Sequence, residues 1–236
     1  MTIDVLYIKG KKSPNNDLEL MYSLRTLEYN CMDYGRVFIT GECPDYIDEN
    51  KVVFTPADDV GVPMMNHWWK VQQTIDRTDI SDDFVLMYDD IFFTQTVYLT
   101  DYPFYKRGVL GMQMTGGEVY RQNLLNTKIW LENHHYPIYD YELHIPCIYN
   151  REKFSSLRDV FEPLKDRGQP ISCRSIYANL FCPQEPYRVD IKLREQGQIV
   201  PTEFDCFSVS DNAFKYETLE YLESKYGERS SFEKWL

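Results

Sequence analysis

The sequence predicts an α/β fold with a mainly parallel central sheet flanked by helices. Short apolar runs rich in β-branched and aromatic residues, typical of buried strands, alternate along the chain with amphipathic segments of helical length. Alternation of this kind favours parallel strands joined by helices. The 236 residues contain no linker, repeat or biased tract, so we expect a single domain over residues 1–236.

The first strand and the first helix have the clearest patterns. Residues 3–8 (IDVLYI) form a short apolar run that predicts a buried strand. Residues 17–30 predict an amphipathic helix, for which Asn16 or Asp17 can supply the cap. Its apolar positions recur at helical spacing: Leu20, Leu24 and Leu27.

The next elements continue the alternation. Residues 36–40 and 51–54 predict two further strands, and residues 66–78 predict a second helix. Residues 84–88 (FVLMY) are the most apolar strand of the chain. Residues 98–135, in which several glycines mark turns, show no clear pattern, so we assign them no secondary structure.

Two later segments predict helices, and a third predicts a strand. Residues 153–164 and 211–226 have helical spacing, and Ser210 or Asp211 is the expected cap of the second helix. Residues 171–177 (ISCRSIY) are apolar and β-like, with one cation in their middle.

Composition excludes several classes of function. The net charge of −12 repels polyanions, so we expect no long nucleic-acid footprint. No run of about 18 apolar residues exists to span a bilayer, and the N-terminus lacks the pattern of a secretory signal. The six scattered cysteines predict reduced, buried thiols, and together these features predict a cytoplasmic protein of unknown oligomeric state.

Two adjacent acids, Asp89 and Asp90, follow the most apolar strand and precede another apolar run. Within a strand one of the two would point into the core at high cost, so we expect them at the strand's carboxyl end, where open α/β sheets bind ligands. Paired carboxylates there fit Mg²⁺ or Mn²⁺ together with the phosphates of a substrate. The alternative is a solvated turn, which is also the expectation for the acid pairs at 58–59 and 82–83.

Two further residues have the chemistry of a site. His144 lies among apolar residues, where it is either a general base or a hydrogen-bonded structural histidine. Arg174 is a lone cation in an apolar segment, so its anionic partner is either a protein carboxylate or a substrate phosphate. His67 and the pair at 134–135 are weaker candidates, and no zinc spacing is present.

Taken in order, several segments resemble the Stealth proteins, which are bacterial capsular polysaccharide phosphotransferases and the eukaryotic N-acetylglucosamine-1-phosphotransferase. The matching segments are IDVLYIKG, LELMYSLRTLEYN with RVFITGECPDYI, PMMNHWWKVQQTIDRTDISDDFVLMYDDIFF, YELHIPCIYNREKF with CRSIY, and CFSVSDN with SSFEK. They are spread over nearly the whole chain.

The resemblance implies a GT-A-like fold and transfer of a sugar-1-phosphate from a nucleotide-diphospho-sugar, a UDP-sugar foremost, to the hydroxyl of a glycan or related acceptor. It assigns the metal, Mg²⁺ or Mn²⁺, to Asp89 and Asp90, and the reacting phosphate to His144 and Arg174. Residues 1–97 would hold nucleotide and metal, and residues 98–236 the acceptor and the catalytic groups. The resemblance also implies that Asp211 completes the catalytic set. The residues that it implies at the nucleotide-sugar donor are Asp4, Arg25, Asn66 and Asn212. A structural role is the alternative for Arg25.

Three departures from the family pattern leave the transferred group open. Tyr88 stands where the family has Asn, Ile8-Lys9-Gly10 replaces Trp-Val-Asp-Gly, and Ser210 replaces Asn. The first alternative is a plain GT-A glycosyltransferase acting on a cell-surface polymer or a modified nucleobase. The others are a non-catalytic sugar- or nucleotide-binding protein and a structural subunit whose aromatic residues form an interface.

Overall fold

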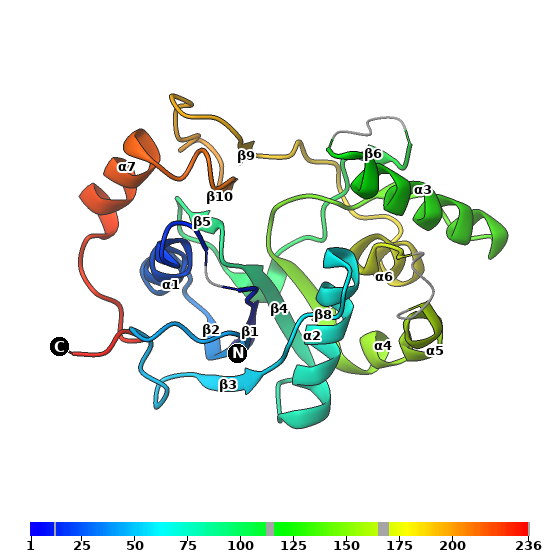
Figure 1. The fold of residues 1–236 in the computed structure, drawn as a ribbon, viewed down its shortest axis with the longest axis horizontal. Helices are drawn as coiled ribbons and strands as arrows, with labels where there is room; N and C mark the ends of the chain where they lie inside the picture. Colours follow the sequence, from blue (N-terminus) through cyan, green and yellow to red (C-terminus); the bar gives the residue numbers. More distant parts are fainter. Residues whose placement is uncertain (12, 112–115, 165–169, 236) are drawn as a thin grey trace.

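A five-stranded sheet forms the centre of the molecule in the computed structural model, which describes residues 1–11, 13–111, 116–164 and 170–235. The strand order is β3-β2-β1-β4-β8, with four parallel strands and the edge strand β8 antiparallel to β4 (Figure 1). The strands are β1 (Ile3–Ile8), β2 (Tyr34–Gly41), β3 (Val53–Pro56), β4 (Asp83–Tyr88) and β8 (Cys147–Asn150). The predicted α/β class with a mainly parallel sheet flanked by helices is confirmed.

Helices cover both faces of this sheet. Alternate side chains of β1 point to opposite faces, so each face offers apolar side chains on which a helix can pack. Leu6 and Ile8 pack in one cluster with Trp68 of helix α2 (Pro63–Arg77). Val5 and Tyr7 pack on the other face with the leucines of helix α1 (Leu18–Asn30). The continuous apolar run of residues 5–8 is therefore the consequence of burial on both sides.

Two smaller sheets and further helices complete the fold. A second sheet has the order β5-β10-β9, and β6 pairs with β7. Their bounds are β5 (Ile91–Phe93), β6 (Gly108–Val109), β7 (Tyr139–Asp140), β9 (Lys192–Leu193) and β10 (Cys206–Val209). The other α-helices are α3 (Glu118–Asn133), α4 (Arg151–Ser155), α5 (Arg158–Phe161), α6 (Cys173–Phe181) and α7 (Tyr216–Tyr226), with 3₁₀ turns at Leu99–Asp101 and Glu162–Leu164. No helix in the described ranges has both the length and the apolar character needed to cross a bilayer.

Three expectations about later elements were wrong. Residues 171–177 are not a strand but begin α6, because the Ser172 hydroxyl accepts a hydrogen bond from the Ser175 amide and caps the helix. Residues 153–164 break into α4, α5 and a 3₁₀ turn. The last helix starts at Tyr216, five residues after the expected cap, because the chain first turns at Ser210, whose carbonyl accepts from the amides of Ala213 and Phe214.

The first helix starts at the expected place but without the expected cap. Asp17 occupies the cap position in a left-handed conformation and makes no capping hydrogen bond. Its carboxylate instead accepts from the Ser13 amide at 2.8 Å and pairs with Lys9 at 2.9 Å. The acid at this position therefore connects the helix start to the end of β1.

A buried ion pair ties the end of the chain to α1. Arg25 donates to both carboxylate oxygens of Glu233 at 2.7 Å, and to the carbonyls of Tyr226 and Gly227 at 3.1 Å. Burial lowers the pKa of Arg25, and the pairing with Glu233 outweighs that effect and raises it. The guanidinium is thus used in holding the terminal segment, which is the structural alternative for Arg25.

Replacing Glu233→Ala leaves the Arg25 charge buried without its carboxylate, which costs about 3–5 kcal/mol for such pairs. We expect a loss of that order in the free energy of unfolding, measured by urea denaturation. The control is Asp79→Ala, which removes an exposed 2.8 Å ion pair to Arg36 and costs about 1 kcal/mol or less. Equal losses in the two variants would contradict the structural role.

Candidate functional site

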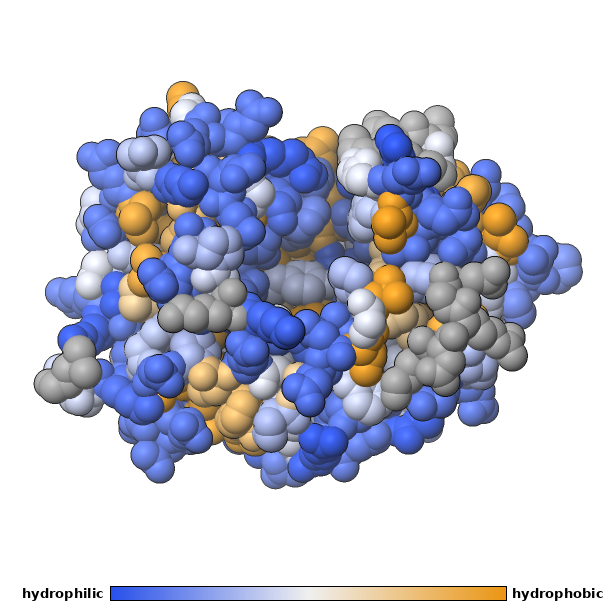
Figure 2. All heavy atoms as spheres, in the orientation of Figure 1, coloured by the Kyte–Doolittle hydropathy of each residue, from blue (hydrophilic) through white to orange (hydrophobic). Residues whose placement is uncertain are grey.

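A pocket of about 760 Å³ opens at the carboxyl ends of β1 and β4. Its walls come from α2, the start of α3, the loop before β8, the start of α6, and β9. The face seen in Figure 2 is hollowed near its centre, between the side that carries β9 and β10 and the side that carries α3 and α6. Four of the residues singled out in the sequence, together with Asn66, line this pocket: Asp89, Asp90, His144 and Arg174.

The register of the central strands sets the first part of the site. Ile8 of β1 lies opposite Tyr88 of β4, so the next residues, Lys9 and Asp89, leave the sheet side by side. Lys9 is almost fully buried, and its ammonium lies 3.3 Å from Asp89 and 2.9 Å from Asp17. Burial lowers the pKa of Lys9, but the two carboxylates outweigh it and raise the pKa, so this lysine is charged.

Asp90 lies where the chain passes from the five-stranded sheet to the three-stranded sheet. It follows Asp89 in a turn and directly precedes β5, which pairs with β10. Its Oδ2 accepts from the Lys192 ammonium at 2.8 Å and from the Ser208 hydroxyl at 3.1 Å. The turn therefore gives the two adjacent acids different partners while both line the same pocket.

Asp89 and Asp90 suit a divalent ion only when oxygens of a substrate complete its coordination. Among the described residues, no cluster of three or more His, Cys, Asp or Glu side chains can hold a metal. Burial and the charge of Asp90 raise the pKa of Asp89 to about 6 despite Lys9, so the acid pair favours additional positive charge. Lys9 and Lys192 contact Asp89 and Asp90 through Oδ2, and these two acids are the side chains that would hold an ion together with substrate oxygens.

Arg174 is buried in the wall of the pocket and is 3% exposed. Within the described part of the chain, no carboxylate pairs with its guanidinium, and its Nε and Nη2 have no hydrogen-bond partner. The guanidinium carbon lies 5.0 Å from the ring centre of Tyr88, which supplies a cation–π contact. Unpaired donors on a buried charge are costly, so this arrangement suits an anionic ligand.

Tyr88 is fixed in turn by His67. The Tyr88 hydroxyl lies 2.7 Å from Nδ1 of His67, and the Tyr149 hydroxyl lies 3.1 Å from Nε2. A neutral imidazole has one donor and one acceptor nitrogen, so two tyrosine hydroxyls satisfy it completely. Burial, aided by the charge of Arg174, holds the pKa of His67 well below its usual value of 6.5.

His144 lies in the loop between β7 and β8 and faces Asp190, which precedes β9. Its Nδ1 is 3.1 Å from both carboxylate oxygens of Asp190. Burial raises the pKa of Asp190, but the hydrogen bond and charge of His144 outweigh it and lower the pKa to about 2. The histidine thus lines the pocket and is hydrogen-bonded to a carboxylate, and its role as a general base stays a prediction.

The other residues implied by the family resemblance are scattered. Asn66 lines the pocket and accepts from the Val60 amide at 2.6 Å. Asp4 lies at the opposite end of β1, bonded to Arg36, and Arg25 lies at the terminal segment. Asp211 and Asn212 are exposed in the turn after β10 and are not among the described residues that line the pocket.

Several pocket residues have no marker in the sequence. Asp59, expected to be a simple turn residue, lines the pocket and holds the Lys70 ammonium at 2.5 Å. Lys70 also donates to the Lys9 carbonyl at 2.7 Å, which ties α2 to the end of β1. Glu142 accepts from the hydroxyls of Ser172 and Ser175, at 2.7 Å from the second. Only the folded chain brings these residues together.

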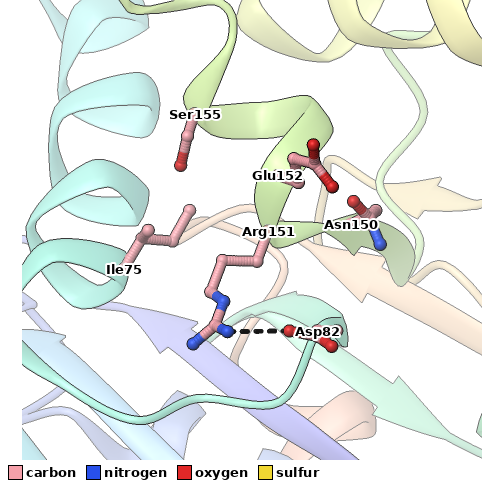
Figure 3. Close-up of a pocket in the computed structure, with 6 residues that line it drawn as sticks. All are labelled: Ile75, Asp82, Asn150, Arg151, Glu152 and Ser155. Atoms are coloured by element: carbon pink, nitrogen blue, oxygen red, sulfur yellow. Dashed lines mark hydrogen bonds and ion pairs between the residues drawn. The ribbon is translucent and has the colours of Figure 1, made fainter.

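A smaller pocket of about 380 Å³ lies near the amino end of β4 (Figure 3). Its cation, Arg151, is paired with Asp82 at 2.8 Å, so its charge is already balanced. The remaining lining residues are Ile75, Asn150, Glu152 and Ser155. The larger pocket is therefore the stronger candidate for an anion site.

The similarity of this chain to known proteins is distant. No protein-family model and no curated protein match the sequence. Among solved structures, the apo form of the glycosyltransferase GlyE from Streptococcus pneumoniae TIGR4 is similar, with a TM-score of 0.40 and 11% identity. The match covers 80% of this chain and 45% of that one, so this chain spans less than half of its length. A match this distant identifies no family, and the resemblance to the Stealth proteins stays a prediction.

His67 makes stability sensitive to acid. The folded protein holds it neutral, whereas the unfolded chain takes up a proton below pH 6.5, so stability is complete above that pH and falls as the pH decreases. One such group contributes a slope of up to about 1.4 kcal/mol per pH unit. We expect His67→Gln to flatten this slope in urea denaturation between pH 7.5 and 5, whereas the exposed His134→Gln leaves it unchanged. A wild-type slope in His67→Gln would disprove the assignment.

Proposed function

We propose that this chain is a nucleotide-sugar-dependent transferase that moves a sugar-1-phosphate to an acceptor hydroxyl. The observation that carries the proposal is Arg174 in the wall of a 760 Å³ pocket, a buried guanidinium with two nitrogens that find no partner among the described residues. Pockets that take drug-sized ligands have volumes of about 300–1,000 Å³. The orphaned fork fits a phosphate group, which accepts two parallel hydrogen bonds.

The acidic pair supports a donor with a diphosphate. Asp89 and Asp90 would hold Mg²⁺ or Mn²⁺, and the ion would supply positive charge to the diphosphate when bound. Lys192 is ion-paired to Asp90 and lines the pocket, so it adds a second positive group near the same phosphates. Such fixed charges favour a donor that gains negative charge on its leaving group.

The chain's own residues divide the reaction between them. Arg174 binds oxygens of the transferred phosphoryl group, and His144 accepts the proton of the attacking hydroxyl. Attack at the β-phosphorus releases a nucleoside monophosphate, whereas attack at the anomeric carbon releases a nucleoside diphosphate. Incubation with a panel of UDP-sugars, the metal and hydroxyl acceptors, followed by chromatography of the released nucleotide, separates the two reactions.

Replacing Arg174→Lys keeps the charge but removes the fork. We expect kcat to fall by roughly 10²-fold, the scale of losing one key electrostatic contact. Arg151→Lys, the same change in the smaller pocket, is the matched control and should leave kcat unchanged. Melting temperatures of both variants establish that they are folded. A folded Arg174→Lys variant with full activity would remove the main support for phosphoryl binding.

The metal assignment is tested by ligand-induced stabilisation. UDP with Mn²⁺ should raise the melting temperature of the wild-type protein more than either component alone, because the nucleotide's phosphates complete the coordination. In the Asp89→Asn/Asp90→Asn double variant we expect this joint effect to disappear. The Asp82→Asn/Asp83→Asn variant is the control for removing two adjacent acids. Equal joint stabilisation in the first double variant would show that the two acids bind no metal.

A further inference from the structure

His144 and Asp190 form a hydrogen-bonded dyad that local sequence and secondary structure do not predict. The two residues are 46 positions apart and meet only because β9 pairs with β10 next to the loop that carries His144. The carboxylate receives two kinds of hydrogen bond from the same residue: the backbone amide of His144 donates at 3.0 Å, and the ring nitrogen Nδ1 lies 3.1 Å away. Two contacts from one residue fix both the position and the plane of the ring.

The chemistry of the carboxylate selects the tautomer. An ionised carboxylate only accepts hydrogen bonds, so Nδ1 of His144 must carry the proton that it shares with Asp190. In a neutral imidazole the other nitrogen, Nε2, then holds a lone pair. That nitrogen is the one able to accept a proton from a substrate in the pocket.

The surroundings keep Asp190 ionised and oriented. Its side chain is 14% exposed, and Arg194 donates to its Oδ2 at 3.3 Å. The pKa of about 2 given above keeps the carboxylate charged throughout the neutral range. Arg107, which pairs with Asp140 at 2.9 Å, also acts on Asp190 through its charge. Two further charged groups line the pocket with His144: Glu142, which is bonded to the α6 serines, and Lys192, which is paired with Asp90.

We propose that Asp190 is a positioning residue that holds His144 with the proton on Nδ1 and stabilises the charged ring once Nε2 has taken a proton. This rests on the proposed function, in which an acceptor hydroxyl attacks the β-phosphorus of the donor. The new bond joins the acceptor oxygen to phosphorus, and the bond from phosphorus to the bridging oxygen breaks. The hydroxyl proton passes to Nε2, and the nucleoside monophosphate leaves with the electron pair of the broken bond.

Three features separate this role from simple support of the loop. A positioning residue acts on the chemical step, so its loss lowers kcat and leaves KM for the donor nearly unchanged. The negative charge favours the protonated ring, so its removal moves the acid limb of the kcat/KM profile to lower pH. The effect also depends on His144, so it vanishes when His144 is already replaced.

The experiment compares Asp190→Asn with the wild-type protein and with Asp82→Asn, the same change at an exposed aspartate of the smaller pocket. For Asp190→Asn we expect kcat to fall by about 10-fold or more, KM to change less than twofold, and the acid limb to shift to lower pH. Asp82→Asn should match the wild type. The double variant Asp190→Asn/His144→Ala should be no slower than His144→Ala alone.

A second measurement does not require activity. Nitrogen-15 spectra of the four histidines, with His144 assigned by its absence in His144→Ala, report which ring nitrogen carries the proton. At neutral pH we expect the Nδ1–H form for His144 in the wild type and loss of that preference in Asp190→Asn.

The outcomes distinguish this proposal from the proposed function. If no nucleotide-sugar is turned over but the spectra show the Nδ1–H form and its dependence on Asp190, the proposed function fails and the pairing stands. If transfer occurs but Asp190→Asn has a wild-type kcat and pH profile, the positioning role is overturned and the proposed function stands. If the fold-losses in kcat of Asp190→Asn and His144→Ala multiply in the double variant, the positioning role is overturned as well.

Discussion

The parallel pairing of β1 with β4 is the constraint on which the site depends. Its register ends with Ile8 beside Tyr88, so the first residues beyond the sheet, Lys9 and Asp89, meet at the carboxyl edge. A buried ammonium requires anionic partners, and Lys9 obtains them from Asp89 and from Asp17 at the start of α1. One charged group thus connects the central sheet, the first helix and the pocket. A shift of one residue in this register would turn each of these side chains to the opposite face.

Two buried arginines show how differently a guanidinium can be used. The guanidinium nitrogens of Arg25 donate to Glu233 and to backbone carbonyls, so its charge is neutralised within the protein. Arg174 instead lies against the ring of Tyr88, which attracts a cation without neutralising its charge or occupying its in-plane donors. His67 holds the Tyr88 hydroxyl and stays neutral, so it adds no positive charge beside the guanidinium. This combination leaves the positive charge of Arg174 directed at the pocket.

Local pattern predicted the sheet and the acid pair but not the contacts that complete the site. Apolar runs on both sides of Asp89 and Asp90 placed them at the end of a buried strand, because burial on two faces leaves a continuous apolar sequence. The segment around Arg174 was expected to be a strand, although Ser172 is a helix cap, because its apolar residues fit either period. Asp190 and Lys192 belong to a strand of only two residues, which is too short to produce a pattern. Arg25 finds its partner 208 residues away, beyond the reach of any local rule.

The charges around the acid pair explain why a lysine at position 9 is compatible with a diphosphate site. Three carboxylates, from Asp17, Asp89 and Asp90, face two ammonium groups, from Lys9 and Lys192. The cluster therefore keeps one negative charge in excess, and burial together with the charge of Asp90 raises the pKa of Asp89. A divalent ion would reverse the sign of this cluster, and the guanidinium of Arg174 would then lie in a pocket that is positive as a whole. A diphosphate balances such a pocket, whereas without the ion the same acids repel it. Under the proposed function, the acid pair thus makes ion and donor bind together, because neither alone neutralises the site.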